Sequence, residues 1–239
     1  MSGQSHRVFI TGGTGYMGRE LIPRLLIRGH SVRALVRRGS QARLPEGCEP
    51  VFGDALDPAS FTSHVPPADT FVQLVGVPHP SPAKAAQFRQ VDLVAGKAGI
   101  RAASQAGVRH FVYLSVAQPA PLMKAYIEVR AECEEEIRAA KLDATVLRPW
   151  YVLGPGHRWP YLIAPLYKAL ELIPATREGA NRLGLVTLQQ MTDALLEAVE
   201  SPVEGIRTMG VPEIRTASNR VEVRQIRIDR SKAPVQHGL

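Results

Sequence analysis

Short apolar, β-branched runs alternate with longer amphipathic stretches along most of the chain. The runs VFI, FVQLV and FVYL are apolar at every position, which is typical of strands buried on both faces of a sheet. This pattern predicts strands over residues 7–11, 31–36, 49–52, 70–74, 110–114 and 144–147, and helices over residues 15–28, 58–64, 84–106 and 124–140. The alternation of strand and helix indicates an α/β fold, a doubly wound parallel sheet of the Rossmann type with helices on both faces.

The rhythm weakens after residue 148, so we divide the chain there. Residues 1–148 are expected to form the dinucleotide-binding Rossmann core, and residues 149–217 a small substrate-side lobe of the same domain. In that lobe we expect a helix over 161–172, a strand over 183–186, a helix over 188–199 and a strand over 207–211. Residues 218–239 form a basic tail, in which the alternating sequence VEVRQIRID predicts one more strand before a frayed end.

A glycine-rich turn follows the first strand. Gly13-x-Gly15-x-x-Gly18 stands between an apolar strand and an amphipathic helix, which is the context that dinucleotide binding requires. The glycines permit a tight turn, a close approach of backbone to pyrophosphate, and close packing of helix on strand. An accidental glycine-rich turn is the alternative that this context disfavours. The residues predicted to contact the cofactor here are Gly12, Thr14, Gly15, Tyr16, Met17 and Gly18.

The second strand ends in two arginines, Arg37 and Arg38. Rossmann proteins that prefer NAD carry an acidic residue in this region for the ribose 2′-hydroxyl, and an acid would repel a 2′-phosphate. Guanidinium groups pair with phosphate, so the sequence predicts NADP(H) in preference to NAD(H). The alternative is that both arginines are merely solvated.

Composition describes an ordinary globular protein with 45% hydrophobic residues and a net charge of +7. No apolar run reaches the length of a transmembrane segment, and the N-terminus shows no signal peptide. The two cysteines form no CxxC pair, which favours the cytoplasm, and the seven histidines lack the spacing of metal ligands, so no metal is expected.

Many of the arginines fall late in the chain. The arginines concerned are Arg207, Arg215, Arg220, Arg224, Arg227 and Arg230. A solvated basic face is the favoured interpretation, with a protein partner or an anionic surface as the alternative. No nucleic-acid motif accompanies the charge, so nucleic acid is not expected as a partner.

Five segments together resemble the atypical short-chain dehydrogenase/reductases, close to the NmrA-like and complex I accessory-subunit-like branches, over about residues 7–200. The segments are TGGTGYMG, VRALVRR, FGDALD, AGVRHFVYLS and LRPWYVLGPG. By position, the resemblance implies that Asp54 and Ala55 lie at the adenine and that Leu74, Val75 and Gly76 line the adenosine ribose. It also implies that Pro149, Tyr151 and Val152 approach the nicotinamide. An alternative role for Asp54 is a turn or a helix cap, although Asp57, which precedes Pro58, is the better cap candidate.

Catalytic members of this superfamily combine a Ser with a YxxxK motif, in which the Tyr transfers a proton and the Lys binds the nicotinamide ribose. The resemblance places Ser115, Tyr126 and Arg130 in these positions, with arginine where the family has lysine. Residues four apart share one helix face, so Arg130 can reach what the lysine would reach. Its rigid fork is larger than an ammonium group, so the exchange is not conservative.

These features favour an NADP(H)-dependent oxidoreductase acting on a small carbonyl or alcohol substrate. The alternative is a non-catalytic NAD(P)-binding sensor or assembly protein, since the YxxxR motif puts catalysis in question while leaving cofactor binding intact. An epimerase or dehydratase is a weaker third possibility.

Overall fold

Seven parallel strands form the central sheet of the computed structural model, in the order β3-β2-β1-β4-β5-β6-β9. The structure describes residues 5–120, 122–155 and 182–232. The strands are β1 (Arg7–Thr11), β2 (Ser31–Val36), β3 (Glu49–Phe52), β4 (Thr70–Gln73), β5 (His110–Leu114), β6 (Ala144–Leu147) and β9 (Ile206–Met209). The expected doubly wound parallel sheet is confirmed.

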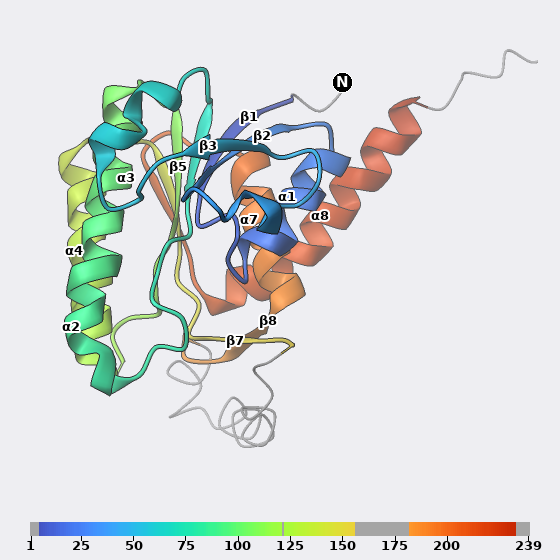
Figure 1. The fold of residues 1–239 in the computed structure, drawn as a ribbon. Helices are drawn as coiled ribbons and strands as arrows, with labels where there is room; N and C mark the ends of the chain where they lie inside the picture. The colour runs from blue at the N-terminus through green and yellow to red at the C-terminus, as the bar shows by residue number, and fades with distance from the viewer. Residues whose placement is uncertain (1–4, 121, 156–181, 233–239) are drawn as a thin grey trace, which may run out of the picture.

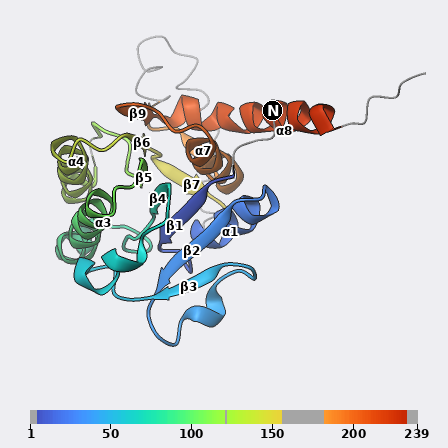
Figure 2. The ribbon, with the colours of Figure 1, turned by 90° about the horizontal axis from the view of Figure 1, so that it is seen from above.

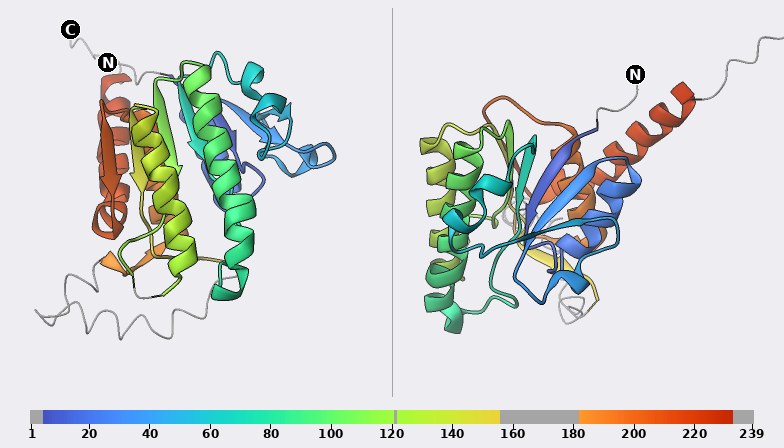
Figure 3. Two further views of the ribbon diagram at one scale, coloured as in Figure 1. Left: turned by 90° about the vertical axis from the view of Figure 1, so that its left-hand side faces the viewer. Right: turned by 45° about the horizontal axis from the view of Figure 1, so that its top comes forward.

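Helices cover both faces of this sheet (Figures 1 and 2). One face carries α1 (Gly18–Ile27), α7 (Leu188–Glu200) and α8 (Val211–Lys232), and the other carries α3 (Val94–Gln105) and α4 (Lys124–Ala139), which Figure 3 shows side by side. Successive side chains of β1 divide between the two layers, since Val8 and Ile10 pack under α1 while Phe9 packs with Phe71 and Phe111. Burial on both faces explains why these strands are apolar at every position.

A small second sheet lies beyond the carboxyl ends of the main strands, at the bottom of Figure 1. It pairs β7 (Tyr151–Leu153) with β8 (Leu185–Thr187) in parallel. Of the segment expected as a substrate-side lobe, only these two strands form a separate sheet among the described residues, because α7 packs against α1 and β9 joins the main sheet beside β6. The helix expected over residues 161–172 falls outside the described residues.

Two of the expected helices are less regular than the pattern predicts. The segment 58–64 forms two 3₁₀ turns, Pro58–Ser60 and Thr62–His64, and Asp57 caps the first of them by accepting from the Ala59 amide at 3.0 Å, as predicted. The segment 84–106 is composite. It runs through a 3₁₀ turn (Pro82–Lys84), α2 (Ala85–Gln87), a π-helix (Phe88–Leu93) and α3. A separate 3₁₀ turn, Gln41–Arg43, follows β2. Helix α1 begins at Gly18, because the glycine turn occupies the residues before it.

The strand expected in the tail is wrong, because that segment continues α8. Helix α8 buries Val211, Ile214 and Ala217 in the same cluster as the apolar side chains of α7. Their spacing is helical, so the helix is already established where the alternating sequence begins. Arg220 of α8 also pairs with Glu197 of α7 at 2.9 Å. Tertiary contact therefore overrides the local strand pattern. No described helix has the length and apolarity needed to cross a membrane.

A buried histidine at the start of β5 makes folding stability depend on pH. His110 is 1% exposed, and its Nε2 lies 3.1 Å from the Thr145 hydroxyl. Burial, helped by the charge of Arg207, lowers the pKa of His110 from 6.5 to about 4. Since the folded state disfavours the proton, this contribution to stability is complete above pH 6.5 and is lost as pH falls toward about 4.

We expect the free energy of unfolding to fall by about 2 kcal/mol between about pH 7 and about pH 5 through this one group. His110→Gln keeps a polar partner for Thr145 but does not titrate, so it should show a correspondingly shallower pH dependence. Urea unfolding of both proteins at the two pH values measures the difference. Identical pH dependence in the two proteins would contradict the assignment to His110.

Candidate cofactor and active site

The glycine turn between β1 and α1 is packed so closely that side chains cannot replace its hydrogens. A Cβ on Gly18 would lie 2.6 Å from the carbonyl oxygens of Gly12 and Gly13, and Gly12 itself has a φ of +79°. The Gly15 amide donates to the Gly12 carbonyl at 3.0 Å, which closes the turn. No side chain caps the start of α1. The turn therefore offers the close backbone approach and the helix N-terminus that a pyrophosphate requires.

A cavity of about 120 Å³ opens beside this turn, at the carboxyl ends of β1, β2 and β3. Four residues predicted from the sequence line it: Gly12, Thr14, Arg37 and Ala55. The other five lining residues were not predicted as site residues: Leu35 and Val36, which end β2, and Ser40, Arg43 and Gly53. No sequence pattern marks Ser40 and Arg43, because a 3₁₀ turn brings them together: Ser40 precedes the turn that ends at Arg43, and residues three apart in such a turn lie on one side.

Two predicted cofactor residues have other contacts in the structure. The Arg38 guanidinium lies over the Phe52 ring, 5.2 Å from its centroid, and Arg38 is not among the lining residues of the cavity. The Asp54 carboxylate accepts from the Leu56 amide at 3.0 Å, which is the turn role weighed as the alternative. Their contact with a cofactor stays a prediction.

The loop after β4 links the glycine turn to α4. The Leu74 amide donates to the Thr11 carbonyl at 3.1 Å, and a Cβ on Gly12 would lie 3.0 Å from the Val75 nitrogen. At the other end of the loop, a Cβ on Gly76 would lie 2.6 Å from Nη2 of Arg130. The predicted residues Leu74, Val75 and Gly76 therefore run from the phosphate-binding turn to the predicted catalytic helix.

Arg130 is held in a buried ion pair with Asp92, a residue not predicted from the sequence. Its Nη2 donates to Asp92 Oδ1 at 2.6 Å, and the two side chains are 5% and 0% exposed. The other Asp92 oxygen accepts from the Val77 amide at 3.0 Å. The signal was a single acidic residue within the apolar helical sequence QVDLVAGKAGI, which is a poor match to a solvated face.

Arg130 also contacts the predicted proton donor. Its Nη2 donates to the Tyr126 hydroxyl at 3.2 Å, and its Nη1 donates to the Leu114 carbonyl at 3.0 Å. The guanidinium lies 5.0 Å from the centroid of the Tyr126 ring. Burial by itself would lower the pKa of Arg130, but the adjacent Tyr126, Tyr113 and Asp92 oxygens raise it, so Arg130 stays charged. Burial raises the pKa of Asp92, and the charge of Arg130 opposes that effect.

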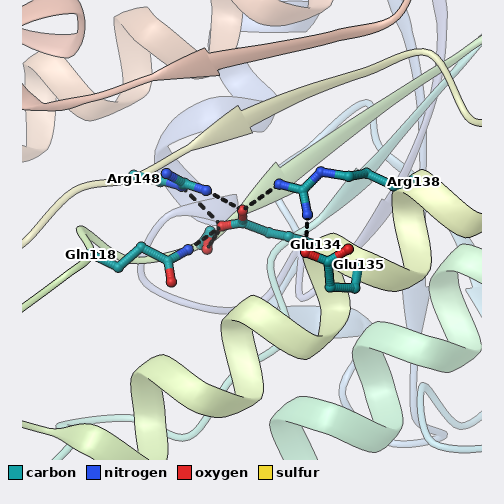
Figure 4. Close-up of polar contacts among 6 residues, drawn as sticks. Gln118, Glu134, Glu135, Arg138 and Arg148 are labelled. Carbon is teal, nitrogen blue, oxygen red and sulfur yellow. Dashed lines mark hydrogen bonds and ion pairs between the residues drawn. The ribbon is translucent and has the colours of Figure 1, made fainter.

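Ser115 belongs to a different network, centred on Glu134 (Figure 4). The Ser115 hydroxyl donates to Glu134 Oε1 at 2.6 Å, and Gln118 donates to the same oxygen at 3.0 Å. Arg148 donates to both carboxylate oxygens, through Nε and Nη2, while Arg138 approaches from the other side. Residues 126, 130 and 134 follow one face of α4 at helical spacing, so Ser115 contacts α4 at Glu134, two turns beyond Tyr126.

Within the part of the chain that the structure describes, Ser115 and Tyr126 share no hydrogen bond. The arrangement supplies a hydroxyl beside a cation at Tyr126, while the Ser115 proton is engaged by a buried carboxylate. Glu134 was not predicted either. Charged residues in amphipathic helices usually face solvent, so the sequence pattern carries no signal for a buried one.

The segment after β6 reaches the same edge of the sheet. The Ala117 amide donates to the Pro149 carbonyl at 2.9 Å, and the predicted Tyr151 and Val152 lie in β7. A Cβ on Gly154 would overlap the Tyr16 hydroxyl, so Tyr16 spans from the glycine turn to the end of β7. The residues predicted at the nicotinamide end are therefore brought to one edge with the glycine turn.

A family model described as NAD(P)H-binding matches residues 12–158, from the glycine turn through β7. The chain belongs to this family. The match confirms the atypical short-chain dehydrogenase/reductase character expected from the sequence, and it makes the protein NAD(P)-binding and reductase-like.

Relatives of this NAD(P)H-binding protein include enzymes and an assembly factor. A 3-diazoavenalumate denitrifying reductase of Streptomyces is 30% identical over 83% of the chain, and a ceramide reductase of Caulobacter vibrioides is 26% identical over 83%. The photosystem II assembly factor Ycf39 of Synechocystis is 30% identical over 59% of the chain. The chain spans 74%, 62% and 44% of the lengths of these three proteins, respectively.

Solved structures support the same fold. The Bordetella bronchiseptica enzyme WbmH, in complex with NAD+, aligns with a TM-score of 0.65 and 18% identity, over 97% of this chain and 84% of WbmH. A short-chain dehydrogenase/reductase superfamily protein from Agrobacterium tumefaciens with bound NAD aligns with a TM-score of 0.62 and 18% identity, over 86% of this chain and 77% of that one. At this identity the likeness concerns the fold alone.

The buried ion pair gives the site a stability test. Asp92→Asn keeps the acceptor for the Val77 amide but leaves the Arg130 charge uncompensated, so we expect a loss of roughly 3–5 kcal/mol in unfolding free energy. The matched control is Glu128→Gln on α4, whose partner is Arg89 in an exposed pair, 61% and 57% accessible. That variant should lose less than about 1 kcal/mol. Equal losses in urea denaturation would show that the buried pair has no special weight.

Proposed function

We propose that the protein is an NADP(H)-dependent oxidoreductase that acts on a small carbonyl or alcohol substrate. The observation that carries the cofactor choice is the cavity at the ends of β1, β2 and β3, whose lining includes two guanidinium groups, of Arg37 and Arg43, and the Ser40 hydroxyl. No carboxylate is among the described residues that line it. Guanidinium groups favour a ribose 2′-phosphate over a bare hydroxyl.

The glycine turn fits the pyrophosphate of such a cofactor. Its backbone is packed too closely for a Cβ at Gly12 or Gly18, so the turn presents backbone without side chains to the phosphate groups. Gly12, Thr14, Gly15, Tyr16, Met17 and Gly18 would hold the pyrophosphate, and Pro149, Tyr151 and Val152 the nicotinamide end. When bound, NADPH supplies a hydride. A cytoplasmic location is part of this proposal and fits Cys48 and Cys133, both of which are free thiols.

The Tyr126 hydroxyl is the proton donor in this mechanism. It accepts a hydrogen bond from Arg130 at 3.2 Å, which leaves its own proton available for a substrate oxygen. As that proton leaves, the fixed positive charge of Arg130 stabilises the phenolate that forms. Arg130 is a positioning residue here, since Asp92 and the Leu114 carbonyl hold it in place and it is 4% exposed. Ser115 lies outside this network, since its hydroxyl donates to Glu134.

A non-catalytic NAD(P)-binding sensor or assembly protein is the second candidate. Two observations favour it: the Ser115 hydroxyl is engaged by Glu134, and Arg130 is enclosed by its own ion pair. The similarity to the assembly factor Ycf39 points the same way and would give the protein a protein partner. The basic C-terminal region is then a candidate contact surface, although Arg207 and Arg220 already pair with Glu197.

The cofactor proposal predicts that NADPH binds more tightly than NADH. Arg37→Ala combined with Arg43→Ala should weaken NADPH binding by about tenfold to a hundredfold, because a charge-assisted hydrogen bond contributes about 1.5–3 kcal/mol. NADH binding should change little. Arg38→Ala is the comparison, and it should cost less NADPH affinity, since Arg38 lies over Phe52 instead of lining the cavity. Calorimetry with both cofactors checks this, and equal wild-type affinities would refute the preference.

The mechanism predicts that Tyr126→Phe lowers turnover by about a hundredfold to ten-thousandfold while leaving NADPH affinity unchanged. Tyr113→Phe is the matched control, because the Tyr113 hydroxyl also accepts from Arg130, at 3.4 Å, but is fully buried. The assay is NADPH oxidation across a panel of carbonyl compounds. Turnover that is indifferent to Tyr126→Phe would reject the mechanism. Tight NADPH binding without any turnover would favour the sensor.

A further inference from the structure

A second cavity, of about 380 Å³, lies at the carboxyl edge of the sheet beyond β6 and β9. Its volume is within the range of small-molecule sites. The polar part of its wall includes Gln118, Arg148 and Arg182, and the apolar part includes Ala117, Val211 and Pro212. The wall thus combines two cationic side chains with hydrocarbon surface, and no acidic side chain is among the described residues that line it.

Arg148 is held by a buried carboxylate along one edge of its guanidinium. Nε and Nη2 bind Glu134, which is 3% exposed, so the plane of the guanidinium group is locked by a buried carboxylate. Among the described residues, Nη1 of Arg148 donates no hydrogen bond, and the side chain is 24% exposed. A pre-oriented guanidinium loses little entropy on binding, and its fork matches a planar carboxylate.

The two acidic side chains near the cavity, Glu134 and Glu213, already have hydrogen-bond partners, so the second edge of Arg148 is left to bind an anion. Glu134 is already satisfied by Ser115, Gln118 and Arg148. The other nearby acid, Glu213, accepts from the Gly210 amide at 3.0 Å and so caps the start of α8. The N-terminal end of that 22-residue helix faces the cavity through Val211 and Pro212 and adds a positive potential.

We propose that this cavity binds the carboxylate of a small organic acid, with Arg148 and Arg182 on the carboxylate and Ala117, Val211 and Pro212 against the carbon skeleton. The inference rests on the proposed function in one respect: the bound acid is the substrate, an oxo acid or the matching hydroxy acid. Hydrogen bonds link this cavity to the predicted catalytic residues. Gln118 and Arg148 bind the same carboxylate, Glu134, as Ser115 does. Ser115 directly follows Leu114, whose carbonyl accepts from Arg130.

The test is calorimetry with 3-phenylpropionate and its neutral isostere 3-phenylpropionamide. The acid should bind and the amide should bind far more weakly. Arg182→Gln should weaken binding of the acid by about tenfold to a hundredfold, because it removes a charge-assisted hydrogen bond. Arg148→Lys keeps a charge for Glu134 but loses the fork, and it should do the same. Arg138→Gln is the matched control: it also faces Glu134, at 3.7 Å, but does not line the cavity.

Equal binding of acid and amide would overturn the proposal, as would an acid affinity that neither Arg182→Gln nor Arg148→Lys changes. Inorganic phosphate that binds more tightly than the acid would overturn the carboxylate assignment in favour of a phosphate site. NADPH titration of the same proteins separates the two claims. Acid binding without NADPH binding would refute the proposed function and leave the carboxylate site standing, and NADPH binding without acid binding would do the reverse.

Discussion

The buried ion pair between Asp92 and Arg130 is the interaction on which the candidate active site depends. It joins four segments: the helix that carries Asp92, the loop after β4 through the Val77 amide, the end of β5 through the Leu114 carbonyl, and α4 with Tyr126. A charge removed from water is expensive unless its partner is fixed and hydrogen-bonded, so none of the four can shift alone. Arg130 thereby acts as the rigid centre of the site instead of as a mobile cation.

A charge of opposite sign lies one turn further along α4. Glu134 is as buried as Arg130, and it gathers the loop after β5 and the residue that follows β6 in the same way. The helix thus carries a buried positive group facing the expected cofactor side and a buried negative group facing the second cavity. This division explains why Ser115 and Tyr126, which the family motif groups together, bind different partners here.

The strands and the glycine turn could be predicted from the sequence because each is determined locally, by continuous apolar runs and by positions where only glycine fits. Other features depend on contacts between distant segments. The VEVRQIRID segment has the pattern of a strand until Ile214 and Ala217 pack with α7, and Glu134 has the pattern of a solvated residue until Arg148 is placed beside it. Arg43 was missed because a 3₁₀ turn, which has little sequence signature, aligns it with Ser40.

The number of residues in the π-helix at Phe88–Leu93 sets the rotation between the helical turns before it and those after it. Each residue of an α-helix advances the side chains by about 100°, so the wider winding of these residues resets the phase between the helical turns before it and those after it. Phe88 packs on the Tyr126 ring, with centroids 4.9 Å apart, while α3 beyond keeps its small residues against the sheet. Deleting one residue here would restore regular winding but rotate Phe88 away from Tyr126. An insertion or deletion in that helix would therefore rotate the side chains that face the candidate active site.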